Sequence, residues 1–262
     1  MPPAARHGPT AERVGSAAPW RLLDDLDSRL DAAGQMAADL ALLDAVAAGG
    51  PSSLRCYRWR SPALTLGRFQ PAADVDLAAC RRIGVEVARR PTGGRALLHG
   101  ADLTYAVAFP EPRGAEAGID SVYRRVSGAL IAGLARLGVE AAVARNDGSP
   151  GAVCMAGQQG ADLRVGSRKV CGSAQVRHRG VVLQHGSVLL DRLPFDETDL
   201  VAGGGDRTAL RSATVTLTEL GAPTDPRVVA DALAEGFREA LDVDFTVTAD
   251  PGALDLQSRP IG

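Results

Sequence analysis

The sequence predicts an α/β protein of the α+β type, in which helices pack against a mixed, mainly antiparallel sheet. Two observations carry this prediction. Short apolar runs of strand length follow one another through residues 54–109 and 139–190. Helical periodicity is confined to three stretches of the chain. A doubly wound parallel sheet would need strands and helices in regular alternation, and hairpins and meanders outnumber that alternation here.

The first helix is expected within residues 34–48, where apolar side chains recur at helical spacing. They are Met36, Leu40, Leu43 and Val46. Gly49 and Gly50 follow and predict the end of the helix, because glycine readily adopts the backbone conformation beyond a helix C-terminus.

Two further helices are indicated by their end signals. One runs through 121–137, with Asp120 as the expected N-cap and Gly138 as the stop. The other starts at Asp225-Pro226, where a capping carboxylate precedes a first-turn proline, and continues to about Leu241.

Strands are expected in the intervals at 54–59, 63–67, 85–90, 96–99, 103–109 and 243–247, with more in 139–190. Gly166-Ser167 separates two short runs and predicts a two-residue hairpin turn. On the returning strand, period-two alternation places Lys169 and Cys171 on one face and Val170 on the other.

Composition excludes several classes of protein. Of the 262 residues, 45% are hydrophobic and 23% charged, which is typical of a globular chain. A net charge of -2 gives no global attraction to nucleic acid. No apolar run has the length of a membrane span. The first residues lack the apolar core of a signal peptide, so we expect a cytoplasmic protein.

The expected organisation is one catalytic domain over residues 20–248, between a flexible N-terminal tail at 1–19 and a C-terminal tail at 249–262. The glycines at 203–205 fit either a boundary or a mobile loop. The cysteines at 56, 80, 154 and 171 show no CxxC spacing, so a structural zinc site is not expected. Each fits a small buried hydrophobe by default.

The first segment whose residues suit binding or catalysis is RRPTGGRALLHG, residues 89–100. A proline and the Gly93-Gly94 pair predict a turn, flanked by Arg90, Arg95 and His99. Exposed amides in such a turn can approach an anion or an acyl carbonyl. The same residues fit a hairpin turn with solvated arginines. The segment is neither a P-loop nor a GxGxxG motif.

Other candidates lie in residues 149–187. Lys169, beside the hairpin turn, fits solvated surface or a carbonyl-binding group, and Gly172-Ser173 interrupts the strand where a substrate can approach the backbone. His185 fits a catalytic base or a satisfied core histidine. Cys154 lies in a Gly/Pro/Ser-rich stretch, where a thiol can become nucleophilic if a cation such as Lys169 favours the thiolate.

Four segments in the same order resemble the lipoate–protein ligase A, octanoyltransferase and biotin–protein ligase superfamily, over about Trp20 to Phe245. YRWRSPALTLGRFQ resembles its early strand pair and RRPTGGRALLH its acyl-pocket loop. GSRKVCGSAQ resembles the segment with its lysine, here Lys169, and GVVLQHGSVLL the strand that follows. The resemblance implies a lipoate/biotin–protein ligase-like catalytic domain.

Within the superfamily, ATP-using ligases resemble RRxTGGGAVYHD, whereas this chain has Arg95 at the third glycine and Gly100 after His99. Cysteine/lysine-type octanoyltransferases resemble RRPTGGRA and place a nucleophilic cysteine fifteen residues before the lysine, the spacing of Cys154 and Lys169. The resemblance therefore implies octanoyl transfer without nucleotide, metal or other cofactor.

In that interpretation Cys154 forms the acyl-enzyme, and Lys169 holds the acyl carbonyl together with backbone amides near Gly172. Cys171 stands where the family usually has a small non-thiol residue, and strand geometry makes it a competing nucleophile. The resemblance also implies a substrate-binding set. Its members are Arg90, Thr92, Gly93, Gly94, Arg95, His99, Gly172, Ser173, Ala174, His185 and Gly186.

The implied donor is octanoyl-acyl carrier protein, and the implied acceptor is the glycine cleavage H protein or a lipoyl domain. No nucleic-acid or membrane partner is expected. Because these proteins are acidic, Arg124, Arg125, Arg177 and Arg179 are docking candidates, or else ordinary solvated charges. Three alternatives stay open: an amidotransferase between lipoyl domains, an ATP-dependent lipoate ligase lacking its accessory domain, and a non-catalytic acyl- or biotin-binding module.

Overall fold

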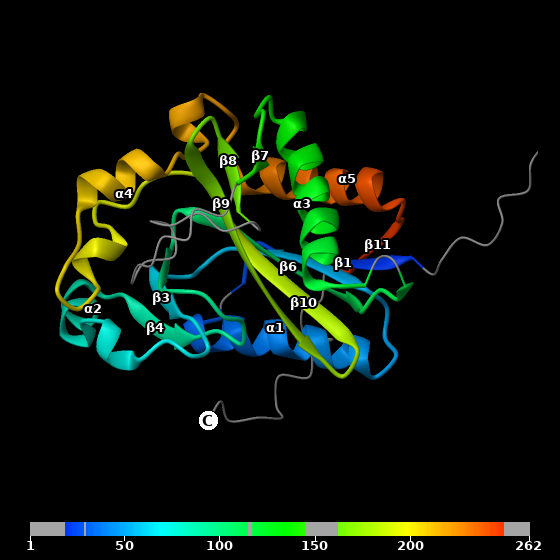
Figure 1. Cartoon of the computed structure of the whole chain (residues 1–262), viewed down its shortest axis with the longest axis horizontal. Coiled ribbons are helices and arrows are strands. Elements are labelled where there is room, and N and C mark those ends of the chain that lie inside the picture. The colour runs from blue at the N-terminus through cyan, green and yellow to red at the C-terminus, as the bar shows by residue number, and fades with distance from the viewer. Residues whose placement is uncertain (1–18, 29, 115–116, 145–161, 249–262) are drawn as a thin grey trace, which may run out of the picture.

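Two sheets of unequal size, with helices packed against them, form the protein (Figure 1). The computed structural model describes residues 19–28, 30–114, 117–144 and 162–248. Within these ranges no helix is both long enough and apolar enough to cross a bilayer.

The large sheet has eight strands in the order β11-β1-β2-β6-β10-β9-β8-β7. Their bounds are β1 Trp20–Asp25, β2 Ser53–Tyr57, β6 Asp102–Pro110, β7 Ala142–Val143, β8 Leu163–Val165, β9 Arg168–His178, β10 Val181–Leu189 and β11 Phe245–Thr248. Only β1 pairs in parallel, with β2 and β11, and the remaining pairs of this sheet are antiparallel. The predicted mixed, mainly antiparallel sheet is confirmed.

The small sheet has the order β4-β3-β5, with β3 at Ala63–Leu66, β4 at Glu86–Arg89 and β5 at Leu97–His99. Helix α2, Leu77–Ile83, packs beside it, and their apolar side chains form a core of their own. The segment 89–100 therefore connects two strands of this sheet, and β6 then leads into the large sheet.

The longer helices cover the two faces of the large sheet. Helices α3, Ile119–Arg136, and α5, Pro226–Leu241, pack on one face, and α1, Ala32–Ala47, packs on the other (Figure 1). Strand β6 serves both faces because alternate side chains point to opposite sides. Leu103, Tyr105 and Val107 join the α3–α5 core, whereas Ala106 and Ala108 contact the α1 core.

Helices α3 and α5 approach each other closely through glycines. A Cβ on Gly236 would lie 2.3 Å from the Ala129 carbonyl oxygen and 2.3 Å from the Gly133 nitrogen. Any larger side chain at Gly236 would separate the two helices, so the crossing requires glycine there.

The predicted helix ends are mostly confirmed. Asp225 caps α5, and Gly138, with φ +77°, follows the last turn of α3. The N-cap assigned to Asp120 is wrong. Helix α3 begins at Ile119 with Gly118 as N-cap, and Asp120 lies in the first turn. There its carboxylate still faces the positive end of the helix dipole.

Other details differ from the expectation. Strand β1, helix α2 and helix α4 at Arg207–Ala213 were not predicted. The hairpin at Gly166 is confirmed. The alternation expected beyond it stays a prediction, since Lys169, Val170 and Cys171 are all buried and Val170 and Cys171 both belong to the core cluster that contains α3 and α5.

Candidate active site

A narrow cavity lies where α1, the small sheet, β9 and β10 meet. Seven of the eleven residues expected to bind substrate line it. They are Arg90, His99, Gly172, Ser173, Ala174, His185 and Gly186. The cavity measures about 20 Å³, enough for about one water molecule, so an acyl chain enters only if its walls move. Met36, in the wall, has a flexible thioether that can give way.

Lys169 does not line this cavity but is fully buried, with 1% of its surface exposed, on the strand β9 that supplies Gly172, Ser173 and Ala174 to the cavity wall. Its ammonium lies 2.8 Å from Oδ2 of Asp162, which is buried too. The backbone N–H of Ser173, which lines the cavity, donates to Oδ1 of the same carboxylate at 3.4 Å. Asp162 therefore links the buried cation to the cavity wall. The solvated position considered for Lys169 does not occur.

His185 joins three parts of the chain. Its Nδ1 lies 2.8 Å from Oδ2 of Asp39 on α1, and its Nε2 lies 2.7 Å from Oγ1 of Thr92 in the turn after β4. Asp39 Oδ1 accepts a hydrogen bond from Arg55 Nη1 at 2.8 Å. The Arg55 guanidinium is also paired with Asp25, so the buried charges compensate each other.

His99 forms a second buried pair at the cavity. Its Nδ1 lies 2.9 Å from Oδ2 of Asp102, its Nε2 lies 2.9 Å from Oγ1 of Thr65, and its ring stacks on Trp59. Burial acts to raise the pKa of Asp102, but the charge and hydrogen bond of His99 and the Gly100 amide outweigh it, and the pKa is lowered. Asp102 therefore stays ionised and holds the orientation of the imidazole.

Arg90 supports the turn at the cavity rim from inside. Its guanidinium donates to the carbonyl oxygens of Thr65, Gly93 and Arg95 at 2.7–3.1 Å. Gly94 adopts φ +92°, which favours glycine at this position. Solvated arginines were the alternative for this segment, and Arg90 does not fit that description, since only 4% of it is exposed.

Four of the expected substrate-binding residues do not line the cavity. Thr92 lies behind His185, and the turn residues Gly93, Gly94 and Arg95 follow it. The Arg95 side chain is half-exposed and lies 3.3 Å from Asp74. Gly186 has an internal role as well, since a Cβ there would lie 2.3 Å from the Gly172 carbonyl oxygen.

The cysteines within the described residues, Cys56, Cys80 and Cys171, are reduced and buried, as expected by default. Burial raises the pKa of Cys171 to about 12 and that of Cys56 to about 12. Thiols of this kind carry almost no thiolate at neutral pH. Cys154 lies outside the described residues. In the described part of the chain, no three His, Cys, Asp or Glu side chains gather in a way that could hold a metal ion.

The carboxylates that hold the site together were missed at the sequence level. Asp39 carries a weak signal, because Gln35 and Asp39 are polar residues four apart in a helix whose remaining residues, apart from Asp44, are apolar or glycine. Asp162 comes shortly before the strand that pairs with the Lys169 strand. Asp102 directly follows the HGA segment, and nothing local indicates its contact with His99.

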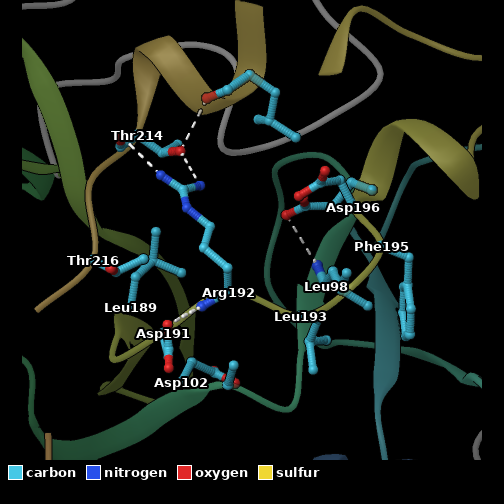
Figure 2. A pocket seen from close by; sticks show the side chains of 13 residues that line it. Leu98, Asp102, Leu189, Asp191, Arg192, Leu193, Phe195, Asp196, Thr214 and Thr216 are labelled. Carbon is cyan, nitrogen blue, oxygen red and sulfur yellow. Dashed lines mark hydrogen bonds between the residues drawn. The ribbon is translucent and has the colours of Figure 1, made fainter. Parts of the chain in front are cut away.

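A second cavity, of about 50 Å³, has Asp102 among the residues that line it (Figure 2). Arg192 points to Thr214 on one wall and donates to its hydroxyl and carbonyl oxygens at 2.7 and 3.1 Å. On the opposite wall the Leu98 amide donates to Oε1 of buried Glu197 at 3.3 Å. Burial raises the pKa of Glu197 to about 7.

Comparison with known proteins identifies the family of the chain. Residues 31–237 match the family described as Lipoyl protein ligase A/B catalytic domain. The chain is 38% identical over 258 residues to an octanoyltransferase LipM of Kyrpidia tusciae, with 92% of each chain covered. It is 40% identical over 252 residues to an octanoyltransferase LipM of Symbiobacterium thermophilum, with 90% of this chain and 89% of the relative covered.

Solved structures share the fold. A bipartite lipoate protein ligase of Thermoplasma acidophilum, described together with its E2 lipoyl domain, superposes with a TM-score of 0.71 at 25% identity over 90% of each chain. A lipoate-protein ligase A bound with ATP gives a TM-score of 0.72 at 24% identity, over 90% of this chain and 91% of that one.

The chain therefore belongs to the lipoyl protein ligase A/B catalytic domain family. The relatives that match it over most of their length show that it is an acyltransferase, namely an octanoyltransferase of lipoate biosynthesis. The superfamily resemblance and the fold class predicted from the sequence are both confirmed.

Proposed function

We propose that the enzyme transfers octanoyl from octanoyl-acyl carrier protein to a lysine of a lipoyl-accepting protein, through a thioester on Cys154. The observation that carries the proposal is the buried Lys169 ammonium, fixed by Asp162 on the strand that supplies Gly172, Ser173 and Ala174 to the cavity. A preorganised, buried cation suits the negative charge that develops on an acyl carbonyl oxygen.

The nucleophile assignment rests on elimination and on spacing. The described cysteines are buried, and Cys171, the competing candidate, has a pKa raised by burial to about 12. Cys154 stands fifteen residues before Lys169, as in the cysteine/lysine-type octanoyltransferases that the chain resembles. These facts favour Cys154 as the thiolate that attacks.

The reaction has two steps, acylation of Cys154 and transfer of the acyl group to the acceptor amine. The Cys154 thiolate attacks the carbonyl carbon of the donor thioester, a C–S bond to Cys154 forms, and the carrier leaves as a thiolate that takes up a proton. The neutral amine of the acceptor lysine then attacks the same carbon. A C–N bond forms, the bond to Cys154 breaks, and the amine releases its proton.

Lys169 stabilises the carbonyl oxygen in both steps, and removing one such donor costs on the order of 10²–10³ in rate. An amide near Gly172 was the other expected donor. The Ser173 amide, however, already donates to Asp162. We therefore assign the oxyanion to Lys169.

The acceptor in this proposal is the glycine cleavage H protein or a lipoyl domain. The similar Thermoplasma acidophilum ligase, described with its E2 lipoyl domain, supports an acceptor of this class. We also propose that residues 20–248 form the catalytic domain, which contains the matched residues 31–237, and that the enzyme acts in the cytoplasm.

Trapping the acyl-enzyme tests the mechanism. Incubation with octanoyl-acyl carrier protein and no acceptor should add one octanoyl group, detected by intact mass and removed by hydroxylamine as thioesters are. Cys154→Ser should abolish the adduct or replace it with a hydroxylamine-resistant ester, and Cys171→Ala, the matched control, should retain it. An adduct that persists in Cys154→Ala and vanishes in Cys171→Ala would show that the nucleophile is Cys171.

The same assay with an acceptor separates the rival activities. Because Arg95 stands where ligases have a glycine beside the adenylate, transfer should proceed without ATP and magnesium. Strict dependence on ATP with free octanoate or lipoate would favour a ligase. Transfer only from an octanoylated lipoyl domain would favour an amidotransferase.

A further inference from the structure

Phe69 projects from the loop after β3 with 83% of its surface exposed. The loop itself is held firmly. Arg89 Nη1 donates to the backbone carbonyl oxygens of Gly67, Arg68 and Gln70 at 2.7, 3.2 and 2.7 Å. A large aromatic side chain that a well-bonded loop keeps in water is typical of a protein–protein contact.

The surroundings of Phe69 are basic. Segments 67–70 and 89–95 contain no aspartate or glutamate, and three of their four arginines, Arg68, Arg89 and Arg95, are not buried. Arg68 lies over the Phe69 ring, with its guanidinium carbon 5.4 Å from the centroid. Asp74, which lies outside these two segments, forms an ion pair with Arg95. An aromatic anchor within an arginine-rich rim complements an acidic partner.

This surface is continuous with the acyl cavity. The Arg68 amide donates to the Thr92 carbonyl oxygen at 2.8 Å, and a Cβ on Gly67 would lie only 1.9 Å from the Gly94 carbonyl oxygen. Arg90 lines the cavity and binds the same turn. The loop at Phe69, the turn at 92–95 and the cavity rim therefore form one unit.

We propose that Arg68, Phe69, Arg89 and Arg95, here called the Phe69 patch, dock the acidic carrier protein that delivers the octanoyl thioester. The inference rests on the proposed function. A carrier presents its acyl group at the end of a long flexible arm, so it can dock on the small sheet while the thioester reaches β9 of the large sheet (Figure 1). An acceptor lysine has a short side chain, so its protein must dock nearer to Lys169.

The test compares two donors that share the octanoyl group, octanoyl-acyl carrier protein and octanoyl-pantetheine. Phe69→Ser and Arg68→Glu should each raise KM for the carrier-bound donor by about tenfold or more. KM for octanoyl-pantetheine and for the acceptor should stay within about twofold. Added salt should raise the carrier KM of the wild type more than that of Arg68→Glu.

Two matched controls lie elsewhere. Val247→Ser alters an apolar side chain on β11 that is 65% exposed, and Arg136→Glu reverses an exposed charge in the last turn of α3. Both should behave as wild type. An unchanged carrier KM in the patch variants overturns the proposal, as does an equal loss with both donors or a rise confined to the acceptor KM.

Direct titration of the carrier separates this proposal from the proposed function. If wild type transfers nothing but binds the carrier, and Phe69→Ser loses that binding, the patch stands and the proposed function falls. If transfer is normal and both patch variants bind and react as wild type, only the patch is refuted. Absence of carrier binding by the wild type refutes the patch directly.

Discussion

The Lys169 ammonium is almost completely buried, and a buried charge is tolerated only when it is paired and hydrogen-bonded. Asp162, at 2.8 Å, supplies that partner and also binds the Ser173 amide in the cavity wall. The carboxylate is therefore a positioning residue. It fixes both the cation and the backbone beside it, so its loss should affect the acylation step as well as stability.

Asp162→Asn should slow formation of the octanoyl-enzyme by about 10–100-fold, because the amide keeps the shape but no longer balances the Lys169 charge. Rapid-quench measurement of thioester formation with saturating donor gives this rate. Lys169→Ala should lower the rate of thioester formation more, by a factor on the order of 10²–10³. Thermal unfolding measurements should show that both variants fold. Acylation at the wild-type rate in folded Asp162→Asn would contradict the positioning role.

The sequence left more than one role open for each of three site residues, Arg90, His99 and His185. Motif order placed them near a substrate, but their burial depends on contacts between distant parts of the chain. His185 and Asp39 are separated by 146 positions in the sequence, and no local sequence pattern predicts a contact between them. Asp102 and Asp162 were missed for a different reason: they lie only three and seven positions from His99 and Lys169, but their side-chain contacts depend on how the chain turns between them.

Among the secondary-structure elements, predictions were most accurate where a local signal also determines the geometry. Asp225-Pro226 begins α5, and the Gly166 turn joins β8 and β9, as their residue types indicate. Helices α2 and α4 have seven residues each, too few for a periodic signal, and both were missed. The α3 N-terminus was misplaced because Asp120 has a capping side chain but lies inside the first turn.

The two helix starts provide a direct comparison. Asp225 Oδ1 accepts from the Arg227 and Val228 amides at 2.8 and 3.2 Å, so Asp225→Ala should lower the free energy of unfolding by about 1 kcal/mol. Asp120→Ala is the matched control and should cost at most about 0.5 kcal/mol, since only a dipole interaction is lost. Urea denaturation measures both, and equal losses would mean that the α3 start has been misassigned.

At the scale of the whole molecule, the sheet order depends on pairings that the sequence pattern does not specify. The alternating and apolar runs predicted a mainly antiparallel sheet, yet they did not indicate that β1 and β11 would form a parallel edge or that three strands would separate into a second sheet. The acyl cavity forms where these two sheets and α1 meet. Its position therefore followed from the family resemblance, and its small volume could not be predicted.

The second cavity, next to the small sheet, has Asp102 and Glu197 among the residues that line it. Glu197 is 8% exposed, and its Oε1 accepts a hydrogen bond from the Leu98 amide at 3.3 Å. Burial raises its pKa to about 7, from about 4.3 in an unfolded chain. The folded state thus binds this proton more tightly than the unfolded state does.

Stability linked to Glu197 should consequently be fully present below about pH 4.3 and lost as the pH rises through about 7, with a total of up to roughly 4 kcal/mol. Glu197→Gln cannot ionise, so its free energy of unfolding should lack this decline between pH 5 and 8 in urea titrations. Glu219→Gln is the control of opposite sign. Hydrogen bonding to Arg192 lowers the pKa of Glu219, so the contribution of Glu219 to the free energy of unfolding is lost as the pH falls. Parallel stability curves for wild type and Glu197→Gln would show that Glu197 is already ionised in the folded protein at neutral pH.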